Sequence, residues 1–406
     1  MRTRYGLSPW IEGVPRAKRP DFARLKGEIT ADVVVIGGGL TGCATAYGAA
    51  AAGLKTVLID AGRIGQGGSG YGAGLLLPTP GPSFRDVAAS QGLRLARRIF
   101  ESWHQASIDA AAQLKRLGVR CRVEPHPSLI TGQQEAVLRK ELEAQHAAGL
   151  DAHWLAPKPI AQAVGLGAVG GIRLKDAFTL DPYAACIGLA AAAGRKRGTF
   201  FERTEVTQIQ VTPRSVDIVC AAGVVRSQKV VIATGTPGPA FKPLRRHFTA
   251  KDSYLVLTEP IPARLRREFG RGDVVLEDHH TPRHRLLWTA DDRVLIGGAD
   301  QPAPVKARDA VLVQRTGQLM YELLLMYPAI AGLRPEYGWS VPYAETADRL
   351  MFIGPHRNYP RHLFALGSGG DSATGAFLAA GILTRALAGK PATTDDDLGW
   401  AAGRLS

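Results

Sequence analysis

The chain has 406 residues, enough for two domains that each bury a sizeable apolar core. Its composition, with 45% hydrophobic and 21% charged residues, excludes a largely disordered chain. The four cysteines are far apart and form no CxxC pair, which excludes a disulfide scaffold and a zinc site of the usual cysteine spacing. Reduced, buried thiols in a cytoplasmic protein are the expected state.

The chain is strongly basic, with a formal net charge of +14 and a concentration of arginine in residues 241–271. Such a balance can favour nucleic acid, an anionic membrane or an anionic substrate. No nucleic-acid motif accompanies the charge, so a solvated, arginine-rich surface without a nucleic-acid partner is favoured. Arg385 interrupts the apolar run 373–389, and no transmembrane segment is expected. The basic start of the chain does not have the pattern of a signal peptide.

The first predicted elements form a strand–helix–strand unit. Residues 31–36 are a short apolar run that ends in glycines, which is typical of a strand buried on both faces of a parallel sheet. An alanine-rich helix is expected over residues 40–52, and "KTVLID" (55–60) predicts the next strand. Apolar residues at steps of three and four then predict helices at 86–117 and 133–149.

The second half of the chain is mixed. Short strands are expected within 199–235 and again within 253–298, followed by a helix from about 305 to 324. Residues 338–390 alternate strand-like pieces with a last helix. There is no internal repeat and no low-complexity linker, so we expect two domains that interleave along the chain.

The glycines Gly37, Gly39 and Gly42 form GxGxxG between the first strand and helix. The first permits a tight turn, the second lets the backbone approach a pyrophosphate, and the third lets helix and strand pack closely. The helix N-terminus then faces the negative charge. Asp60 ends the second strand, where an acidic side chain binds ribose hydroxyls and disfavours the 2′-phosphate of NADP. These residues predict NAD or FAD binding.

Three further segments favour FAD, the longer cofactor. A glycine- and serine-rich loop covers residues 63–74, a buried strand ends in small residues at 230–235, and glycines precede a helix start in 366–381. A helix N-terminus in the last segment would place positive potential beside a bound group, which favours an anionic reduced flavin.

The ordered series "GGSGYGAG", "TLDP", "VVIATG", "LTEP", "RVLIGGAD" and "ALGSGGDSATG" resembles the D-amino-acid oxidase superfamily of FAD-dependent oxidoreductases over nearly the whole chain. That superfamily includes glycine, sarcosine and γ-glutamylputrescine oxidases. The resemblance implies an α/β fold in which a Rossmann-type FAD-binding domain interleaves with an α+β substrate domain built on a mixed sheet. The FAD-binding domain is expected at 1–84, 177–245 and 336–406, and the substrate domain at 85–176 and 246–335.

By matched position, the resemblance also implies the residues that contact FAD. They are Gly37, Gly39, Leu40, Thr41, Gly42, Asp60, Ala61, Gly68, Ser69, Gly72, Val206, Ala233, Thr234, Gly235, Gly354, Gly369, Gly370, Asp371, Ser372, Ala373 and Thr374.

Several positions depart from the pattern that the resemblance implies. Tyr343 stands where amino-acid oxidising members carry an Arg for the substrate carboxylate, and Arg283 or Arg285 is a candidate substitute. Thr374 stands where sarcosine oxidases carry a Lys that promotes reaction with oxygen. Their covalent cysteine is also absent, because no Cys lies in 335–350. Non-covalent FAD is therefore expected, with O2 or another electron acceptor.

The leading hypothesis is an FAD-dependent oxidase or dehydrogenase that oxidises a C–N bond of an amine or amino-acid-like small molecule by hydride transfer to flavin N5. Tyr343, His284, Tyr254 and Arg285 are the candidate catalytic residues. An FAD-dependent 2-hydroxy acid dehydrogenase, with His284 as base, is one alternative. A flavin-binding protein or complex subunit without turnover is the other. No metal is expected, because Pro282 argues against a helix that presents His279, His280 and His284 together. A homo-oligomer is compatible with the sequence.

Overall fold

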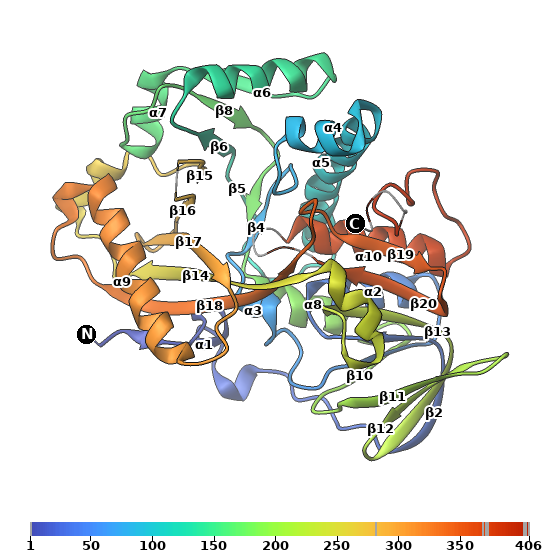
Figure 1. The fold of residues 1–406 in the computed structure, drawn as a ribbon. Helices are drawn as coiled ribbons and strands as arrows, with labels where there is room; N and C mark the ends of the chain where they lie inside the picture. Colours follow the sequence, from blue (N-terminus) through green and yellow to red (C-terminus); the bar gives the residue numbers. More distant parts are fainter. Residues whose placement is uncertain (1, 281, 368, 370–372, 401–403, 405–406) are drawn as a thin grey trace.

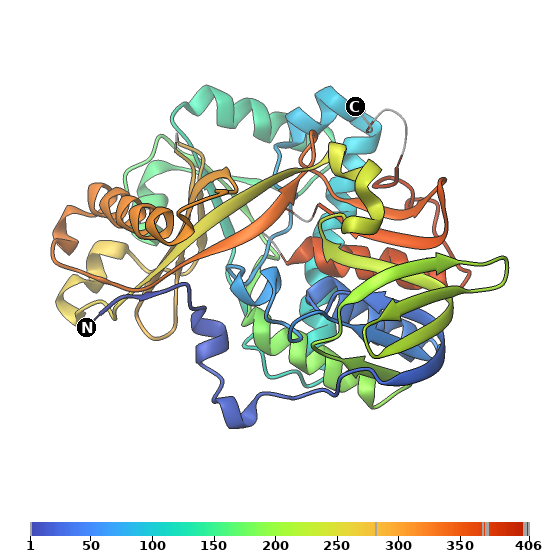
Figure 2. The same cartoon turned by 60° about the horizontal axis from the view of Figure 1, so that its bottom comes forward.

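The computed structural model describes residues 2–280, 282–367, 369, 373–400 and 404. Figure 1 shows two lobes, each built on a large sheet, and Figure 2 shows the long strands β14 and β18 running from one lobe towards the other. The first lobe contains an eight-stranded sheet. Its strands are β10 (Gly198–Phe201), β3 (Thr56–Ile59), β2 (Gly27–Ile36), β13 (Gly223–Gly235), β12 (Val216–Cys220) and β11 (Val206–Val211) in that order, with β20 (Tyr359–Leu366) on β13 and β19 (Phe352–His356) on β20.

Strand β13 is the branch point of this sheet. Residues 223–232 of β13 run parallel to β2, while its first residues pair antiparallel with β12 and its last residues pair parallel with β20. Strands β10, β3, β2, β13 and β20 therefore make a parallel centre, as the apolar run 31–36 predicts. The carboxyl ends of β2, β3 and β13 lie together and carry the glycine-rich turns.

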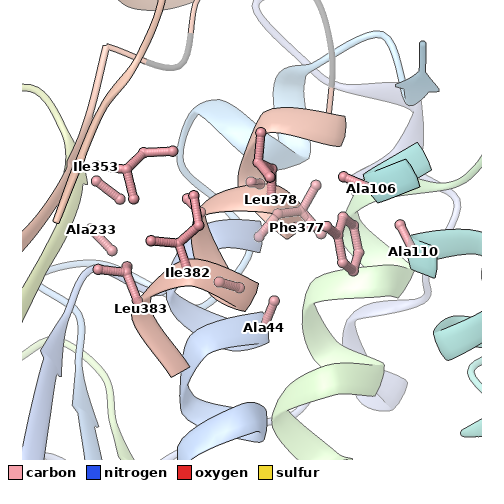
Figure 3. Close-up of a cluster of buried hydrophobic side chains, with 14 of the residues drawn as sticks. Ala44, Ala106, Ala110, Ala233, Ile353, Phe377, Leu378, Ile382 and Leu383 are labelled. Atoms are coloured by element: carbon pink, nitrogen blue, oxygen red, sulfur yellow. The ribbon is translucent and has the colours of Figure 1, made fainter. Parts of the chain in front are cut away.

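One face of the parallel strands is covered by helices α2 (Leu40–Ala51), α5 (Leu93–Arg116), α8 (Pro182–Gly194) and α10 (Thr374–Leu387). In Figure 3, Phe377 of α10 lies close to Ala106 and Ala110 of α5, and Ile382 and Leu383 lie towards the sheet. Alanine on α2 and α5 lets α10 pack closely, because small side chains allow helices to approach. Strands β11 and β12 and the 3-10 helix η2 (Pro239–His247) cover the other face.

The second lobe contains a nine-stranded mixed sheet. In order, its strands are β1 (Arg4–Tyr5), β18 (Pro335–Glu345), β14 (Thr249–Thr258), β17 (Val294–Pro302), β16 (His284–Trp288), β15 (Val275–Asp278), β6 (Ser128–Thr131), β8 (Gly171–Leu174) and β7 (His153–Leu155). Helices α9 (Arg308–Met326) and α7 (Pro157–Val164) pack on one face. The other face meets the first lobe, and α6 (Glu135–Ala147) covers its end.

The remaining elements are short. They are the sheet β4 (Leu75–Leu76), β9 (Phe178–Thr179) and β5 (Glu124–Pro125), the helices α1 (Pro9–Glu12), α3 (Gly68–Tyr71) and α4 (Phe84–Gln91), and the 3-10 helices η1 (Arg16–Lys18), η3 (Ala263–Phe269) and η4 (Pro328–Ile330).

Most of the predicted elements are confirmed, including the helix at 40–52, which is α2, and the helix at 305–324, which is α9. The predicted helix at 86–117 is wrong in one respect, since it consists of α4 and α5 separated by Gly92. Gly92 has φ +84°, a conformation that breaks a right-handed helix and that glycine adopts without strain.

Two segments lie differently from the proposed domain boundaries. Strands β1 and β18 fall in ranges expected for the FAD-binding domain, but they pair within the nine-stranded sheet. Helix α5 falls in a range expected for the substrate domain, but its buried face packs on α10 in the first lobe. Sheet pairing and helix packing join residues far apart in sequence, so these memberships depend on partners that local patterns do not reveal. With these two shifts, the division into two domains stays a proposal.

Candidate functional site

The turn between β2 and α2 can be built only with glycine. Gly37 has φ +109°, and a Cβ there would lie 2.5 Å from the carbonyl oxygen of Ala233. A Cβ on Gly42 would lie 1.8 Å from the carbonyl oxygen of Gly37. The backbone of the turn therefore lies directly against β13 and the first turn of α2. This is the close approach that a phosphate-binding turn requires.

Asp60 holds this turn from the end of β3. Its Oδ2 accepts a hydrogen bond from the backbone N–H of Gly38 at 2.6 Å, and its Oδ1 accepts one from Gly62 at 2.7 Å. The nearby Ser69 accepts a hydrogen bond from the N–H of Leu40 at 2.9 Å, at the start of α2. The carboxylate and the hydroxyl therefore lie on either side of the glycine-rich turn.

A cavity of about 870 Å³ extends from this turn along the carboxyl ends of β2, β3 and β13. Most of the residues that the sequence suggested for FAD line it. These residues are Gly37, Gly39, Leu40, Thr41, Asp60, Ala61, Gly68, Ser69, Gly72, Val206, Ala233, Thr234, Gly235, Gly369 and Ala373.

Three of the suggested residues that the structure describes, Gly42, Gly354 and Thr374, do not line the cavity. Gly370, Asp371 and Ser372 lie outside the described residues. Gly42 lies behind the turn and packs α2 on the strand. Gly354 lies in β19, away from the described lining, and the buried Thr374 donates its hydroxyl to the carbonyl of Leu77 at 2.8 Å. The structure therefore gives no support to direct FAD contacts from Gly354 and Thr374.

The part of this cavity lined by β14, β18 and α9 is polar. Of its polar residues, the sequence indicated only Tyr343. Tyr343 of β18 lines it and donates a hydrogen bond to Asp300 at 2.9 Å. Lys251, Asp252 and Arg308 line it as well. Burial raises the pKa of the Asp252 carboxyl, against the lowering effect of Arg308. The two adjacent charged residues that precede the apolar run in "AKDSYLVL" are a signal that could have indicated Lys251 and Asp252.

A second cavity, of about 390 Å³, adjoins the first, because Ala73 lines both. Part of it lies against the face of the nine-stranded sheet that meets the first lobe, and residues of α9, which packs on the opposite face, also line it. Leu255 and Leu295 supply apolar contacts, while the guanidinium groups come from Arg283, Arg285, Arg315 and Arg349. Arg285 lies 3.5 Å from the carboxylate of Glu277, its cross-strand partner, and Glu277 also accepts a hydrogen bond from Ser128 at 2.5 Å. This cavity is suited to an anionic group.

Two of the suggested catalytic residues point to the opposite face of the sheet. Side chains alternate along a strand, so His284 and Arg285 face opposite sides. The His284 ring lies 2.8 Å from Glu322 of α9, although His284 also borders the smaller cavity. Tyr254 is buried and accepts a hydrogen bond from Gln301 at 2.8 Å, and it lines neither cavity among the described residues. The geometry therefore argues against catalytic roles for His284 and Tyr254.

His284 instead belongs to a buried charge cluster. Burial alone would lower its pKa, but Asp278, whose Oδ2 lies 3.8 Å from Nδ1, and Glu322 together raise the pKa above its ordinary value. The pKa of Asp278 is about 2, because the neighbouring His284 and His280 outweigh the effect of burial. His279 behaves differently, since burial lowers its pKa to about 4.

Glu277 is a site residue that sequence reasoning missed. The available signal was a charged residue inside the apolar strand "VVLEDHH", opposite the charged residues of "RHRLLW".

Within the described residues, no group of three or more His, Cys, Asp or Glu side chains is arranged to hold a metal ion. None of the helices in the described part of the chain combines the length and apolarity needed to cross a bilayer.

Comparison with known proteins agrees with this geometry. The family model for FAD dependent oxidoreductases (DAO) matches residues 32–386. The chain is 27% identical to gamma-glutamylputrescine oxidoreductase of Escherichia coli (strain K12) over 347 residues, 83% of this chain and 79% of that protein. It is 25% identical to glycine oxidase of Bacillus licheniformis over 351 residues, 83% of this chain and 87% of that protein.

Solved structures show the same fold. Glycine oxidase from Geobacillus kaustophilus superposes with a TM-score of 0.74 at 18% identity, covering 90% of this chain and 96% of that one. L-amino acid deaminase from Proteus vulgaris, lacking its specific insertion, gives a TM-score of 0.75 at 16% identity, covering 96% and 98%. The predicted combination of a Rossmann-type domain with a mixed-sheet domain is confirmed. The chain belongs to the family of FAD-dependent oxidoreductases known as the DAO family.

Proposed function

We propose that this protein oxidises a C–N bond of a small amine that carries a carboxylate. The observation behind this proposal is that an arginine-lined cavity adjoins the dinucleotide cavity at Ala73. The names of the relatives given above indicate that they act on amines or amino acids, and this supports the same chemistry here. Electrons would then pass to O2 or another acceptor.

The larger cavity fits FAD without rearrangement of the turn. The glycine backbone at Gly37 and Gly39 leaves room for a pyrophosphate at the start of α2, and Asp60 lies where a ribose would bind. Val206, Thr234 and Ala373 line the rest. Bound FAD supplies the acceptor for a hydride and its electron pair.

The chain's own residues would bind and orient the substrate. Arg285 presents a planar guanidinium that can pair with a carboxylate through two parallel hydrogen bonds. Leu255 and Leu295 present apolar surface in the same cavity, which would exclude water around a bound substrate. The substrate loses a hydride from carbon and a proton from nitrogen, and the resulting imine is hydrolysed to a carbonyl compound and a released amine.

One observation favours a second candidate, the oxidation of a 2-hydroxy acid. His279 lines the arginine-rich cavity, and its lowered pKa keeps the ring neutral at neutral pH. A neutral imidazole can accept a hydroxyl proton while a hydride leaves the same carbon. His279 therefore replaces His284 as the candidate base for this reaction.

The experiment that separates the two candidates is anaerobic mixing of the purified holoenzyme with carboxylated amines and with matched 2-hydroxy acids. Bleaching of the flavin absorbance by the amines supports C–N oxidation. Bleaching only by the hydroxy acids replaces it with the second candidate. Bleaching by neither class rejects both.

A further inference from the structure

One row of residues crosses the nine-stranded sheet beneath the arginine-lined cavity. Leu255 of β14 lies opposite Gly297 of β17, Gly297 opposite Arg285 of β16, and Arg285 opposite Glu277 of β15. The row continues to Ile130 of β6. Residues that lie opposite one another point to the same face of a sheet, so the whole row faces the first lobe.

A third cavity, of about 530 Å³, lies over the continuation of this row. Ile130 and its cross-strand partner Ile172 line its inner end. Glu277, His279 and Arg283 line both this cavity and the smaller arginine-lined one. The three cavities therefore follow one another, joined first at Ala73 and then at Glu277 and its neighbours. We call the third cavity the outer cavity.

The outer cavity is held between two helices and is partly open to solvent. Glu141 of α6 accepts hydrogen bonds from the backbone N–H groups of Phe84 and Arg85 of α4, at 2.8 and 3.2 Å, and so ties the two helices together. Figure 1 shows α4 and α6 side by side at this end of the molecule. The rim residues Ala89 and Gln134 are exposed, while Ile130 and Leu138 are buried.

The lining of the outer cavity differs from that of the arginine-rich cavity. Its floor is apolar, made by Phe100, Ile130, Leu138 and Ile172. The lining also contains the side-chain amides of Gln133, Gln134 and Gln145. Its charges nearly cancel, because the acidic Asp86, Glu141 and Glu277 lie with the basic Arg85 and Arg283. An apolar floor with hydrogen-bonding walls and little net charge is suited to an uncharged chain that carries few polar atoms.

We propose that the substrate is extended, with its amine and carboxylate between Ala73 and Arg285 and an uncharged tail in the outer cavity. This inference rests on the proposed function. Adjacent strands lie about 4.8 Å apart, so the four steps from Leu255 to Ile130 span about 19 Å, far more than a glycine-sized molecule fills. The tail runs across the strands above Glu277 and ends against Ile130 and Ile172.

The test uses N-methylglycine, N-butylglycine and N-hexylglycine with the holoenzyme, and it measures kcat/KM for anaerobic flavin reduction. Each methylene fully buried on the apolar floor improves kcat/KM by about fourfold, so even if only two of the five extra methylenes of N-hexylglycine are buried, it exceeds N-methylglycine by about tenfold. A decrease with length overturns the inference.

The variant Ala89→Trp places a large side chain at the rim of the outer cavity, and Ala147→Trp is its matched control on an exposed face of α6 that lines neither cavity. Ala89→Trp is expected to remove the gain with tail length and to leave N-methylglycine within about twofold, a change of the size normal for surface substitutions. Ala147→Trp keeps the full gain. The same length dependence in both variants overturns the inference.

A binding measurement separates this inference from the proposed function. Acetate, hexanoate and decanoate cannot be oxidised at a C–N bond, and their binding is followed by the perturbation of flavin absorbance. If no amine reduces the flavin, but the longer carboxylates bind more tightly and lose this advantage in Ala89→Trp, the proposed reaction fails and the tail site stands. If binding does not depend on length, the tail site is rejected.

Discussion

Arg285 and Glu277 lie opposite each other on β16 and β15, with Nε and Oε2 3.5 Å apart, on the sheet face that meets the FAD-binding lobe. Glu277 is only 5% exposed, so its charge needs this partner and the Ser128 hydroxyl. The pair joins the cavity beside Ala73 to the cavity between α4 and α6. Its cationic half, Arg285, is the group that we propose to hold the substrate carboxylate.

Replacing Arg285 by Gln is expected to lower kcat/KM for carboxylated amines by about 10- to 100-fold, the worth of a hydrogen bond to a charged group. The same amines without the carboxylate should be affected little. Steady-state kinetics with both substrate sets measures this difference. An equal loss for both sets would contradict carboxylate binding.

The Arg285→Gln variant also leaves the buried Glu277 carboxylate without its cation, so the protein itself is expected to be less stable. The double variant Arg285→Gln with Glu277→Gln should recover thermal stability and keep the kinetic defect. Arg226→Gln, at an exposed position on β13, is the control.

Asp60→Asn is expected to weaken FAD binding by about tenfold, since an amide accepts the backbone hydrogen bonds less strongly than a carboxylate. Titration of the apoprotein with FAD, followed by flavin fluorescence, measures the dissociation constant. Asp32→Asn is a matched control, because Asp32 also accepts a backbone N–H, from Lys55 at 2.7 Å, but lies outside the cavity lining. Equal effects of the two substitutions would remove Asp60 from the binding site.

Gly42→Ala should destabilise the protein by about 2–3 kcal/mol, because the new methyl group would overlap the carbonyl of Gly37. Gly317→Ala is the contrasting variant: a Cβ there meets nothing within 4 Å, and the residue lies inside α9. It should stabilise the protein by about 0.5–1 kcal/mol. Denaturant unfolding of both variants checks the two opposite signs.

The raised pKa of His284 predicts that this residue contributes to the stability of the folded protein in a pH-dependent way. Its pKa is raised in the folded state, so its stabilising charge is fully present below the ordinary value of 6.5 and is lost as pH rises through the folded value. The loss of stability in His284→Gln should therefore be larger at about pH 5.5 than at about pH 8.5. Unfolding free energies at both pH values measure it, with His153→Gln on the exposed β7 residue as control. A deficit that grows with pH would contradict this assignment.

Non-covalent binding predicts that all FAD leaves the protein on acid denaturation. None of the four cysteines lines the 870 Å³ cavity. Ultrafiltration of the denatured protein should leave the flavin absorbance in the filtrate. Flavin retained with the polypeptide would show a covalent link.

The nucleotide-binding half of the site could be predicted because its signal is local. The strand, turn and helix around Gly37 and the strand that precedes Asp60 follow one another between Gly27 and Asp60. The glycines are needed because the turn leaves no room for a side chain at Gly37 and Gly42.

The substrate half could not be predicted to the same extent. Tyr254 and His284 both lie opposite Gly298, while Leu255 and Arg285 both lie opposite Gly297, so the two rows face opposite sides of the sheet. A shift of one residue in register exchanges the rows. Within "RHRLLW" the sequence therefore could not distinguish the side chain that faces the cavity from the one that faces α9. The loss of the family's Arg at Tyr343 was visible, but its replacement depends on this register.

Strand β20 and helix α10 lie against β13 and α2, although they follow β2 and α2 by more than 300 residues in the sequence. During synthesis, the turn at Gly37 emerges from the ribosome long before the strand β20 and the helix α10 that complete its lobe. The nascent chain must therefore keep a half-built apolar core until residues 359–387 have been synthesised. We therefore expect chains shortened before residue 359 to expose this core and to aggregate.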